Sequence, residues 1–252
     1  MCLILVSLKS HPSFPLIIAA NRDEFYARET APMAWHDSAP PVLCGTDLKE
    51  GGTWMGVTDT GRFAALTNHR DPSRIKPDAA SRGWIVSEFL KGTDHAPAFA
   101  EALSRTRHNY NGFNLLFGTV DRLYHYSNIS DTLTELPPGV HGISNALLNT
   151  PWPKVETGKK ELGALDHPDE EALFSLLADQ AVPEDALLPD TGMTLEWERI
   201  LGPLFIHSEV YGTRSSCLVT LSADRTLTAT ERTYTPAGPA DINGERRFQF
   251  SV

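Results

Sequence analysis

A continuously apolar segment near the start of the chain limits the folds that are open to it. Residues 16–20 read Leu-Ile-Ile-Ala-Ala, without one polar side chain. A strand of this composition is typically buried on both faces, whereas a half-buried strand alternates apolar and polar residues. The segment therefore predicts a strand inside a sheet that is covered on both sides.

The other strand-like and helix-like segments are short and are separated by turn signals. A hairpin is predicted around Asp59-Thr60-Gly61, because glycine adopts the positive φ that a tight turn demands. Residues 30–50 and 137–142 contain prolines and show no periodicity, so both are expected to be irregular. Strands are expected at 2–8, 16–20, 53–57, 63–67, 113–120, 123–126, 216–222, 226–234 and 246–252, and helices at 84–90, 96–107, 154–165 and 169–180.

The order of these elements favours an α+β fold with antiparallel sheets, because strands joined by hairpins pair in antiparallel fashion. Two such sheets stacked face to face, with helices on their outer faces, make a four-layer αββα sandwich. A single sheet with helices fits the pattern equally well. The 252 residues contain no internal repeat, low-complexity tract or linker, so one domain spanning residues 1–252 is expected.

The composition excludes several classes of protein. A net charge of −10 argues against nucleic-acid binding, which usually needs a positive face. No apolar run approaches the ~20 residues that cross a bilayer, so no integral membrane segment is expected. Three cysteines without a CxxC pair fit a reducing compartment, and we expect a cytoplasmic protein. No zinc-ligand spacing or haem-attachment motif is present, so no metal site is expected.

The second residue, Cys2, is a candidate catalytic nucleophile. Removal of Met1 would leave Cys2 with both a thiol and a free α-amine. An α-amine titrates near pH ~7.7–8.0, so much of it is neutral at physiological pH and accepts a proton. One residue then supplies nucleophile and base, which is the logic of N-terminal nucleophile (Ntn) enzymes. The alternative is that Cys2 is a small apolar residue at the start of a buried strand.

A polar cluster, Asn21-Arg22-Asp23-Glu24, directly follows the apolar strand. On pattern alone it is a turn with solvated charges. Together with Cys2, however, the cluster resembles the NRDE family, which includes the transport and Golgi organisation proteins. Further segments share that resemblance along the whole chain: Gly51-Gly52-Thr53-Trp54-Met55-Gly56-Val57, Gly61-Arg62-Phe63-Ala64-Ala65-Leu66-Thr67-Asn68, Asn111-Gly112-Phe113-Asn114-Leu115, Gly142-Ile143-Ser144-Asn145 and Tyr211-Gly212-Thr213-Arg214-Ser215-Ser216.

The family in turn resembles Ntn hydrolases of the choloylglycine hydrolase and penicillin V acylase type, which implies the αββα fold. The resemblance implies that Asp23 orients the α-amine of Cys2. It also implies that Asn68 and Asn145 stabilise the oxyanion and that Arg214 lowers the pKa of the thiol.

One position departs from that pattern. Ala20 stands where those hydrolases carry an arginine before the strand-end asparagine. Arg22 offers a positive charge from a different backbone position.

Two functions follow from the resemblance. The first is hydrolysis of an amide or thioester of a small lipophilic acyl compound, with Cys2 as nucleophile and no cofactor. The second is a non-catalytic carrier of haem or acyl-CoA, in which the segment Asn21-Arg22-Asp23-Glu24 binds a propionate or phosphate and Cys2 is a pocket residue. Trp54 is either a wall of the ligand pocket or a core tryptophan behind a turn. A partner-binding scaffold has no specific support, and the oligomeric state stays open.

Overall fold

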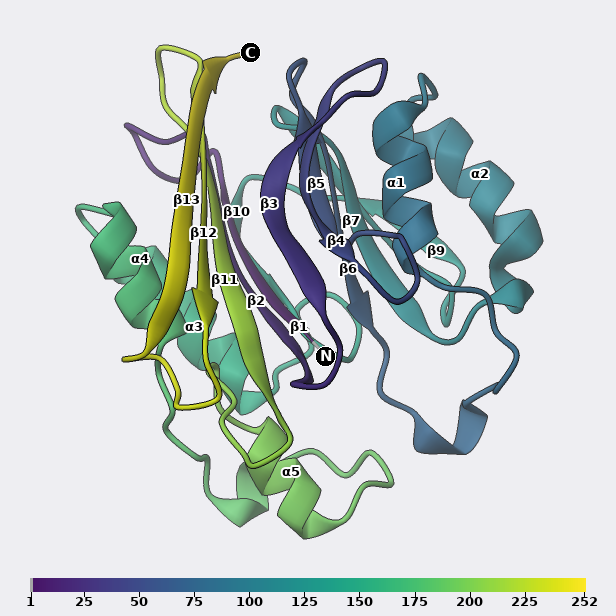
Figure 1. The fold of residues 1–252 in the computed structure, drawn as a ribbon, viewed down its shortest axis with the longest axis vertical. Coiled ribbons are helices and arrows are strands. Elements are labelled where there is room, and N and C mark those ends of the chain that lie inside the picture. The colour runs from purple at the N-terminus through teal and green to yellow at the C-terminus, as the bar shows by residue number, and fades with distance from the viewer. Residues whose placement is uncertain (1) are drawn as a thin grey trace.

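The computed structural model describes residues 2–252, and its strands form two antiparallel sheets (Figure 1). Sheet A has the order β10-β1-β2-β11-β12-β13, and sheet B runs β3 to β9 in sequence order. The strands of sheet A, in spatial order, are Gly139–Ile143, Cys2–Leu8, Leu16–Phe25, Tyr211–Leu221, Thr226–Tyr234 and Ile242–Ser251. Those of sheet B are Thr30–His36, Val42–Asp47, Met55–Thr58, Arg62–Asn68, Phe113–Thr119, Arg122–Ser127 and Thr132–Glu135.

Helices cover the outer face of each sheet (Figure 1). Helices α1 (Gly83–Lys91) and α2 (Ala96–Thr106) pack on sheet B, and α3 (Pro153–Ala164) and α4 (Glu170–Leu177) pack on sheet A. Helix α5 (Leu195–Leu201) lies at one end of the sandwich, and short 3-10 turns span Pro72–Arg74, Arg107–Asn109 and Asp185–Leu187. The expected αββα layering is therefore present, and the single-sheet alternative is wrong.

Three hydrophobic clusters hold the layers together. The cluster between the sheets contains Ile4, Ile18, Phe63 and Val219, all less than a twentieth exposed. A second joins sheet B to α1 and α2, and a third joins sheet A to α3 and α4. Strand β2 contributes Ile18 to the first cluster and Ile17 to the third. This double burial is what its unbroken apolar run predicted, because alternate side chains of a strand point to opposite faces.

Three of the expected assignments are wrong. Residues 30–50 form β3 and β4 because Pro32 falls in a bulged edge strand, where a missing N–H is tolerated. The loop expected at 137–142 overlaps β10, which is an edge strand of sheet A. The strand expected to stop at residue 20 continues to Phe25, because β1 and β11 pair with it on either side.

The strand β9 and the helix α5 were not expected from the sequence at all. Helix α5 has a clear local cause, because the side chain of Thr194 accepts a hydrogen bond from the N–H of Trp197 and caps its first turn. The remaining hairpins and helices agree with the expected positions to within a few residues. Across residues 2–252 we find no helix with the length and apolarity to cross a membrane.

Close backbone contact between Gly52 and Gly83 fixes where α1 begins. A Cβ atom on Gly52 would lie 2.6 Å from the carbonyl carbon of Gly83, so any larger residue has to displace the helix. A second glycine, Gly45 on β4, leaves room for the ring of Trp54. Gly52, before Trp54, therefore allows close approach of the start of α1.

We predict that Gly52→Ala lowers the free energy of unfolding by about 1–3 kcal/mol, the usual cost of forcing an extra methyl group into a packed site. The measurement is urea denaturation followed by circular dichroism. Gly163→Ala is the matched control, because Gly163 is an exposed helical residue whose added Cβ meets only the side chain of Val140, at 3.5 Å. The control is expected to be neutral or stabilising, and equal losses in both variants would contradict the explanation.

Candidate functional site

The register between β1 and β2 places Cys2 beside Arg22. Ile4, two residues after Cys2, pairs with Ala20, two residues before Arg22, and both belong to the cluster between the sheets. Cys2 and Arg22 therefore face the interior of the sandwich. The side chain of Asp23 points to the opposite face, toward the helices, because successive side chains alternate along a strand.

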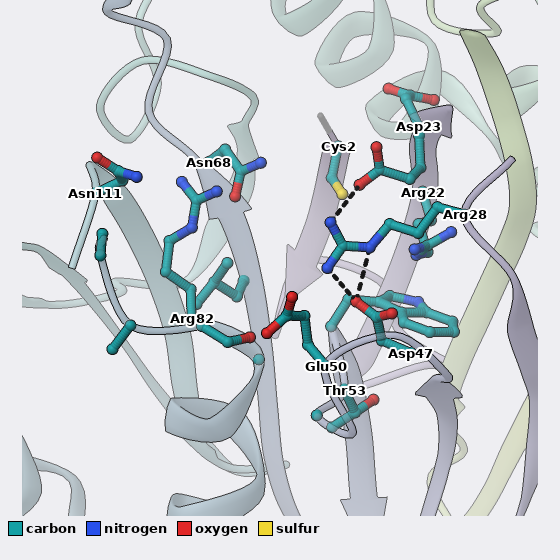
Figure 2. A pocket seen from close by; sticks show the side chains of 18 residues that line it. Cys2, Arg22, Asp23, Arg28, Asp47, Glu50, Thr53, Asn68, Arg82 and Asn111 are labelled. Atoms are coloured by element: carbon teal, nitrogen blue, oxygen red, sulfur yellow. Dashed lines mark hydrogen bonds and ion pairs between the residues drawn. The ribbon is translucent and has the colours of Figure 1, made fainter. Parts of the chain in front are cut away.

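Cys2 opens into a cavity of about 220 Å³, which we call the Cys2 cavity. Figure 2 shows Cys2 and Arg22 on one wall, with Asn68, Arg82 and Asn111 on the other. The cavity is mostly polar. Its remaining lining residues are Asp23, Glu24, Arg28, Asp47, Glu50, Gly52, Thr53, Trp54, Leu66, Ala79, Ala80, Ser81 and Gly83.

Arg22 is the buried cation nearest in register to the thiol. Its guanidinium lies 4.4 Å from the centre of the Trp54 ring, and the residue is only 6% exposed. Within residues 2–252 its Nη1 atom has no hydrogen-bond partner. Burial raises the pKa of the Cys2 thiol, while Arg22 and a backbone hydrogen bond from Asp23 act in the opposite direction. Arg22 is thus placed to stabilise a thiolate or a bound anion.

Two carboxylates at the cavity rim are held by a single arginine. Arg28 forms an ion pair of 2.5 Å with Asp47 at the end of β4 and a longer one of 3.9 Å with Glu24 on β2 (Figure 2). This bridge joins the two sheets at the mouth of the cavity.

On the far wall Arg82 donates a hydrogen bond from Nη1 to the carbonyl of Gly112. Nothing in the local sequence around Arg28 or Arg82 signals that they meet at one cavity.

The two asparagines implied by the family resemblance have different positions. Asn68 is the last residue of β6, is half-buried and lines the cavity. Asn145 is fully buried, and its Nδ2 donates a hydrogen bond of 2.9 Å to the backbone carbonyl of Asn68. Its Oδ1 accepts bonds from Ser144 and Arg70. Asn145 therefore holds the strand end that carries Asn68 and does not itself line the cavity.

Asp23 lies beneath the start of β1 and is 1% exposed. Its Oδ1 accepts a hydrogen bond of 2.7 Å from Thr213, and its backbone carbonyl accepts one of 2.9 Å from Tyr211. Burial raises the pKa of the Asp23 carboxyl, and the neighbouring Lys154 opposes that rise. The carboxylate is directed away from the sulfur of Cys2 (Figure 2), toward the backbone side of the strand start.

Arg214 and Asn21 serve the framework in this structure. A bulge between Thr213 and Ser215 carries Arg214 out of the ladder, and its Nη1 donates to the carbonyls of Phe25, Tyr26 and Arg28. It does not line the Cys2 cavity. Asn21 is also buried. Its Nδ2 donates to the carbonyls of Leu177, at the end of α4, and Leu204, and its Oδ1 accepts a hydrogen bond from Ser216. Of the expected ligand-binding residues, Arg22, Glu24 and Trp54 reach the cavity.

A second, mainly apolar cavity of about 340 Å³ adjoins the first, and we call it the apolar chamber. Glu24, Asn68, Arg82 and Asn111 line both spaces, so the two cavities share the wall that holds Asn68. The apolar side chains of the chamber come from the strand β2, from loops and from the region of α5: Phe25, Ile75, Ile129, Met193, Trp197 and Leu201. None of them formed a recognisable pattern in the sequence. Among residues 2–252 no group of His, Cys, Asp and Glu side chains is arranged to hold a metal ion.

Comparisons with known proteins match nearly the whole chain. The family model for "Transport and Golgi organisation 2" matches residues 1–236. The Transport and Golgi organization protein 2 homolog of Bos taurus is 34% identical, covering 95% of each chain. The homologue of Homo sapiens is 33% identical over 92% of each chain.

Among solved structures, an N-acylethanolamine-hydrolyzing acid amidase orthologue from Caenorhabditis elegans superposes with a TM-score of 0.51 at 12% identity, covering 86% of this chain and 92% of that one. A mutant conjugated bile acid hydrolase from Clostridium perfringens gives a TM-score of 0.49 at 12% identity, covering 98% and 92%. The first likeness shows that the fold is that of the Ntn hydrolases.

We predict that Arg22→Met slows alkylation of Cys2 by iodoacetamide about tenfold at neutral pH. Removing a neighbouring cation raises the pKa of the thiol, and a rise of about one unit lowers the thiolate fraction tenfold. Peptide mass spectrometry of timed samples measures the rate. Arg62→Met is the control, because Arg62 also stacks on a ring, 4.1 Å from the centre of Phe89, but does not line the Cys2 cavity. Equal rates in Arg22→Met and the wild type would contradict the assigned role.

Proposed function

Because this chain belongs to the Transport and Golgi organisation 2 family and has the Ntn-hydrolase fold, we propose that it is a hydrolase with Cys2 as its N-terminal nucleophile. The observation that carries the proposal is the position of the Cys2 thiol. It opens into the Cys2 cavity beside Arg22 and across from Asn68. Among the cysteines of residues 2–252, Cys44 and Cys217 are buried and Cys2 is partly exposed.

The proposed chemistry begins once Met1 has been removed. The α-amine of Cys2 takes the thiol proton, and the sulfur attacks the carbonyl carbon of the substrate. The carbonyl oxygen carries the negative charge of the tetrahedral intermediate, and the side chain of Asn68 is placed to donate to it. The bond to the leaving amine or thiol then breaks, and that group receives the proton. Water hydrolyses the resulting acyl-cysteine and restores the thiol.

The two adjoining cavities suit a substrate with two unlike ends. An apolar acyl group fits the apolar chamber, while its amide or thioester lies at the shared wall near Asn68. The polar leaving group would then occupy the Cys2 cavity, whose lining mixes arginines and carboxylates. This arrangement favours a small lipophilic acyl compound, and the reaction written above needs no cofactor.

The apolar chamber also favours a second candidate function. A protein that only carries an acyl-CoA or haem would use the same pair of cavities without turnover, with Arg22 facing an anionic group. In that case Cys2 is a wall residue and Met1 can stay. The two functions differ in whether the bound acyl group is transferred to sulfur.

The deciding experiment measures intact mass and acyl transfer together. The purified chain should lack Met1, and incubation with a medium-chain acyl-CoA should give an acyl adduct on the Cys2 peptide, followed by release of free acid. Cys2→Ala should show neither adduct nor release, while Cys44→Ala, at a buried thiol outside the Cys2 cavity, should keep both. Stoichiometric binding without adduct in both wild type and Cys2→Ala would favour the carrier, and a retained Met1 would overturn the hydrolase.

We predict that Asn68→Ala lowers kcat about 10²–10³-fold with little change in KM, because an oxyanion donor acts mainly in the transition state. Steady-state kinetics on the substrate identified above provide the measurement. Asn111→Ala is the comparison, since Asn111 lines the same wall but lies in the loop before β7 and not at the end of a strand. A larger loss of kcat in Asn111→Ala would move the donor role to that residue.

A further inference from the structure

A group of four buried or nearly buried charges lies on the helix side of sheet A, beneath the start of β1. It consists of Asp23 on β2, Arg70 just after β6, Lys154 in the first turn of α3 and Glu198 on α5, and we call it the buried charge cluster. Arg70 and Glu198 form an ion pair of 2.5 Å, and their side chains are 5% and 4% exposed. Arg70 also stacks on Trp152, 4.8 Å from its ring centre.

Lys154 is the unexplained member of this cluster. It is 3% exposed, yet within residues 2–252 its Nζ atom has no hydrogen-bond partner. It also sits in the first turn of a helix, where the peptide dipoles disfavour a cation. Burial lowers its pKa to about 8, although Asp23 and Cys2 act to raise it. A lysine that is expensive to bury and forms no bond does not stabilise the fold by its contacts.

The charges of the cluster are balanced before the α-amine of Cys2 is counted. Arg70 and Lys154 supply two positive charges, while Asp23 and Glu198 supply two negative ones. The thiol of Cys2 faces the cavity, while its backbone nitrogen lies at the strand start, where Cys2 pairs with Arg22, the residue before Asp23. An ammonium at that nitrogen would be an uncompensated fifth charge in a region of low dielectric, so the neutral amine is favoured there.

We propose that Lys154 is a positioning residue that acts through Asp23: its ammonium balances the carboxylate, and the α-amine of Cys2 stays neutral and able to accept the thiol proton. The inference rests on the proposed function. It resolves a conflict within that function, because a lone carboxylate near an amine would hold it as ammonium. The charged groups around Lys154 are Asp23, Arg70 and Glu198, with the Cys2 thiol across the strand. The Tyr211 hydroxyl on β11 lies near Asp23 and Arg70.

The sign of the pH effect follows from this balance. Below about pH 8 Lys154 is charged and Asp23 is balanced. Without that cation, the carboxylate would stabilise an ammonium on Cys2 and raise the pKa of the α-amine. The base would then become available only at higher pH. Lys154→Met removes the charge and keeps the length of the side chain, whereas Lys154→Arg keeps the charge.

The test is the pH profile of kcat/KM for the chain that begins at Cys2. In Lys154→Met the acid limb should move about one unit to higher pH, a roughly tenfold loss of rate on that limb, and Lys154→Arg should restore the wild-type limb. Glu198→Gln, which removes a negative charge and keeps the size of the side chain, should move the limb to lower pH. Shifts of opposite sign cannot come from a purely structural defect. An unchanged limb in folded Lys154→Met, or shifts of the same sign in both variants, overturns the inference.

Failure of the proposed function can be told apart from failure of this inference. If the wild type shows no turnover, the hydrolase is excluded, and the inference is decided by NMR pH titration of a chain with nitrogen-labelled cysteine. That measurement follows the α-amine of Cys2 without any substrate. A higher pKa of the amine in Lys154→Met than in the wild type supports the inference, and equal values overturn it. If Lys154→Met does not fold, the Glu198→Gln comparison still gives the answer.

Discussion

The pairing of β1 with β2 in the interior of sheet A is the constraint on which the rest of the structure depends. It fixes Cys2 opposite Arg22, and the alternation of side chains then sends the thiol to one face of the sheet and the Asp23 carboxylate to the other. A slip of one residue would exchange these faces. The buried apolar residues on both sides of β2 prevent such a slip, because each belongs to a different hydrophobic cluster. Core packing thus determines the environment of the sulfur.

Much of this fold can be predicted from local pattern, and most of the site cannot. Local sequence is enough to predict the strand at 16–20 and the hairpin at Asp59-Thr60-Gly61, and both predictions are confirmed. The charged residues up to Phe25 remain in the strand only because β11, from almost two hundred residues later, pairs with them and supplies Thr213 and Tyr211 as partners. No local propensity contains that information.

The family resemblance selected residues that lie in or near the Cys2 cavity, but it did not predict how each side chain is placed. Asn68 lies at the end of its strand and lines the cavity, whereas the side-chain amide of Asn145 donates a hydrogen bond to the backbone carbonyl of Asn68. A bulge between Thr213 and Ser215 takes Arg214 out of the strand pairing, and its side chain does not line the Cys2 cavity. The sequence around Arg214 gives no sign of this bulge. Lys154 could not be singled out because a lysine in a first helical turn is usually solvated. Buried charges are costly, and a protein that tolerates several in one place commonly does so where its chemistry occurs.

The outermost strand of sheet A has a consequence for the behaviour of this protein in concentrated solution. Strand β13 is largely exposed and carries Glu245, Arg246 and Arg247 in succession. An open sheet edge is a template on which another polypeptide can add a strand, and charged side chains along the edge oppose such growth. Arg232 forms an ion pair with Glu245 across β12 and β13, and Arg247 forms one with Glu170. The charged residues of β13 therefore stabilise its attachment to the fold and also oppose the addition of a strand from another molecule.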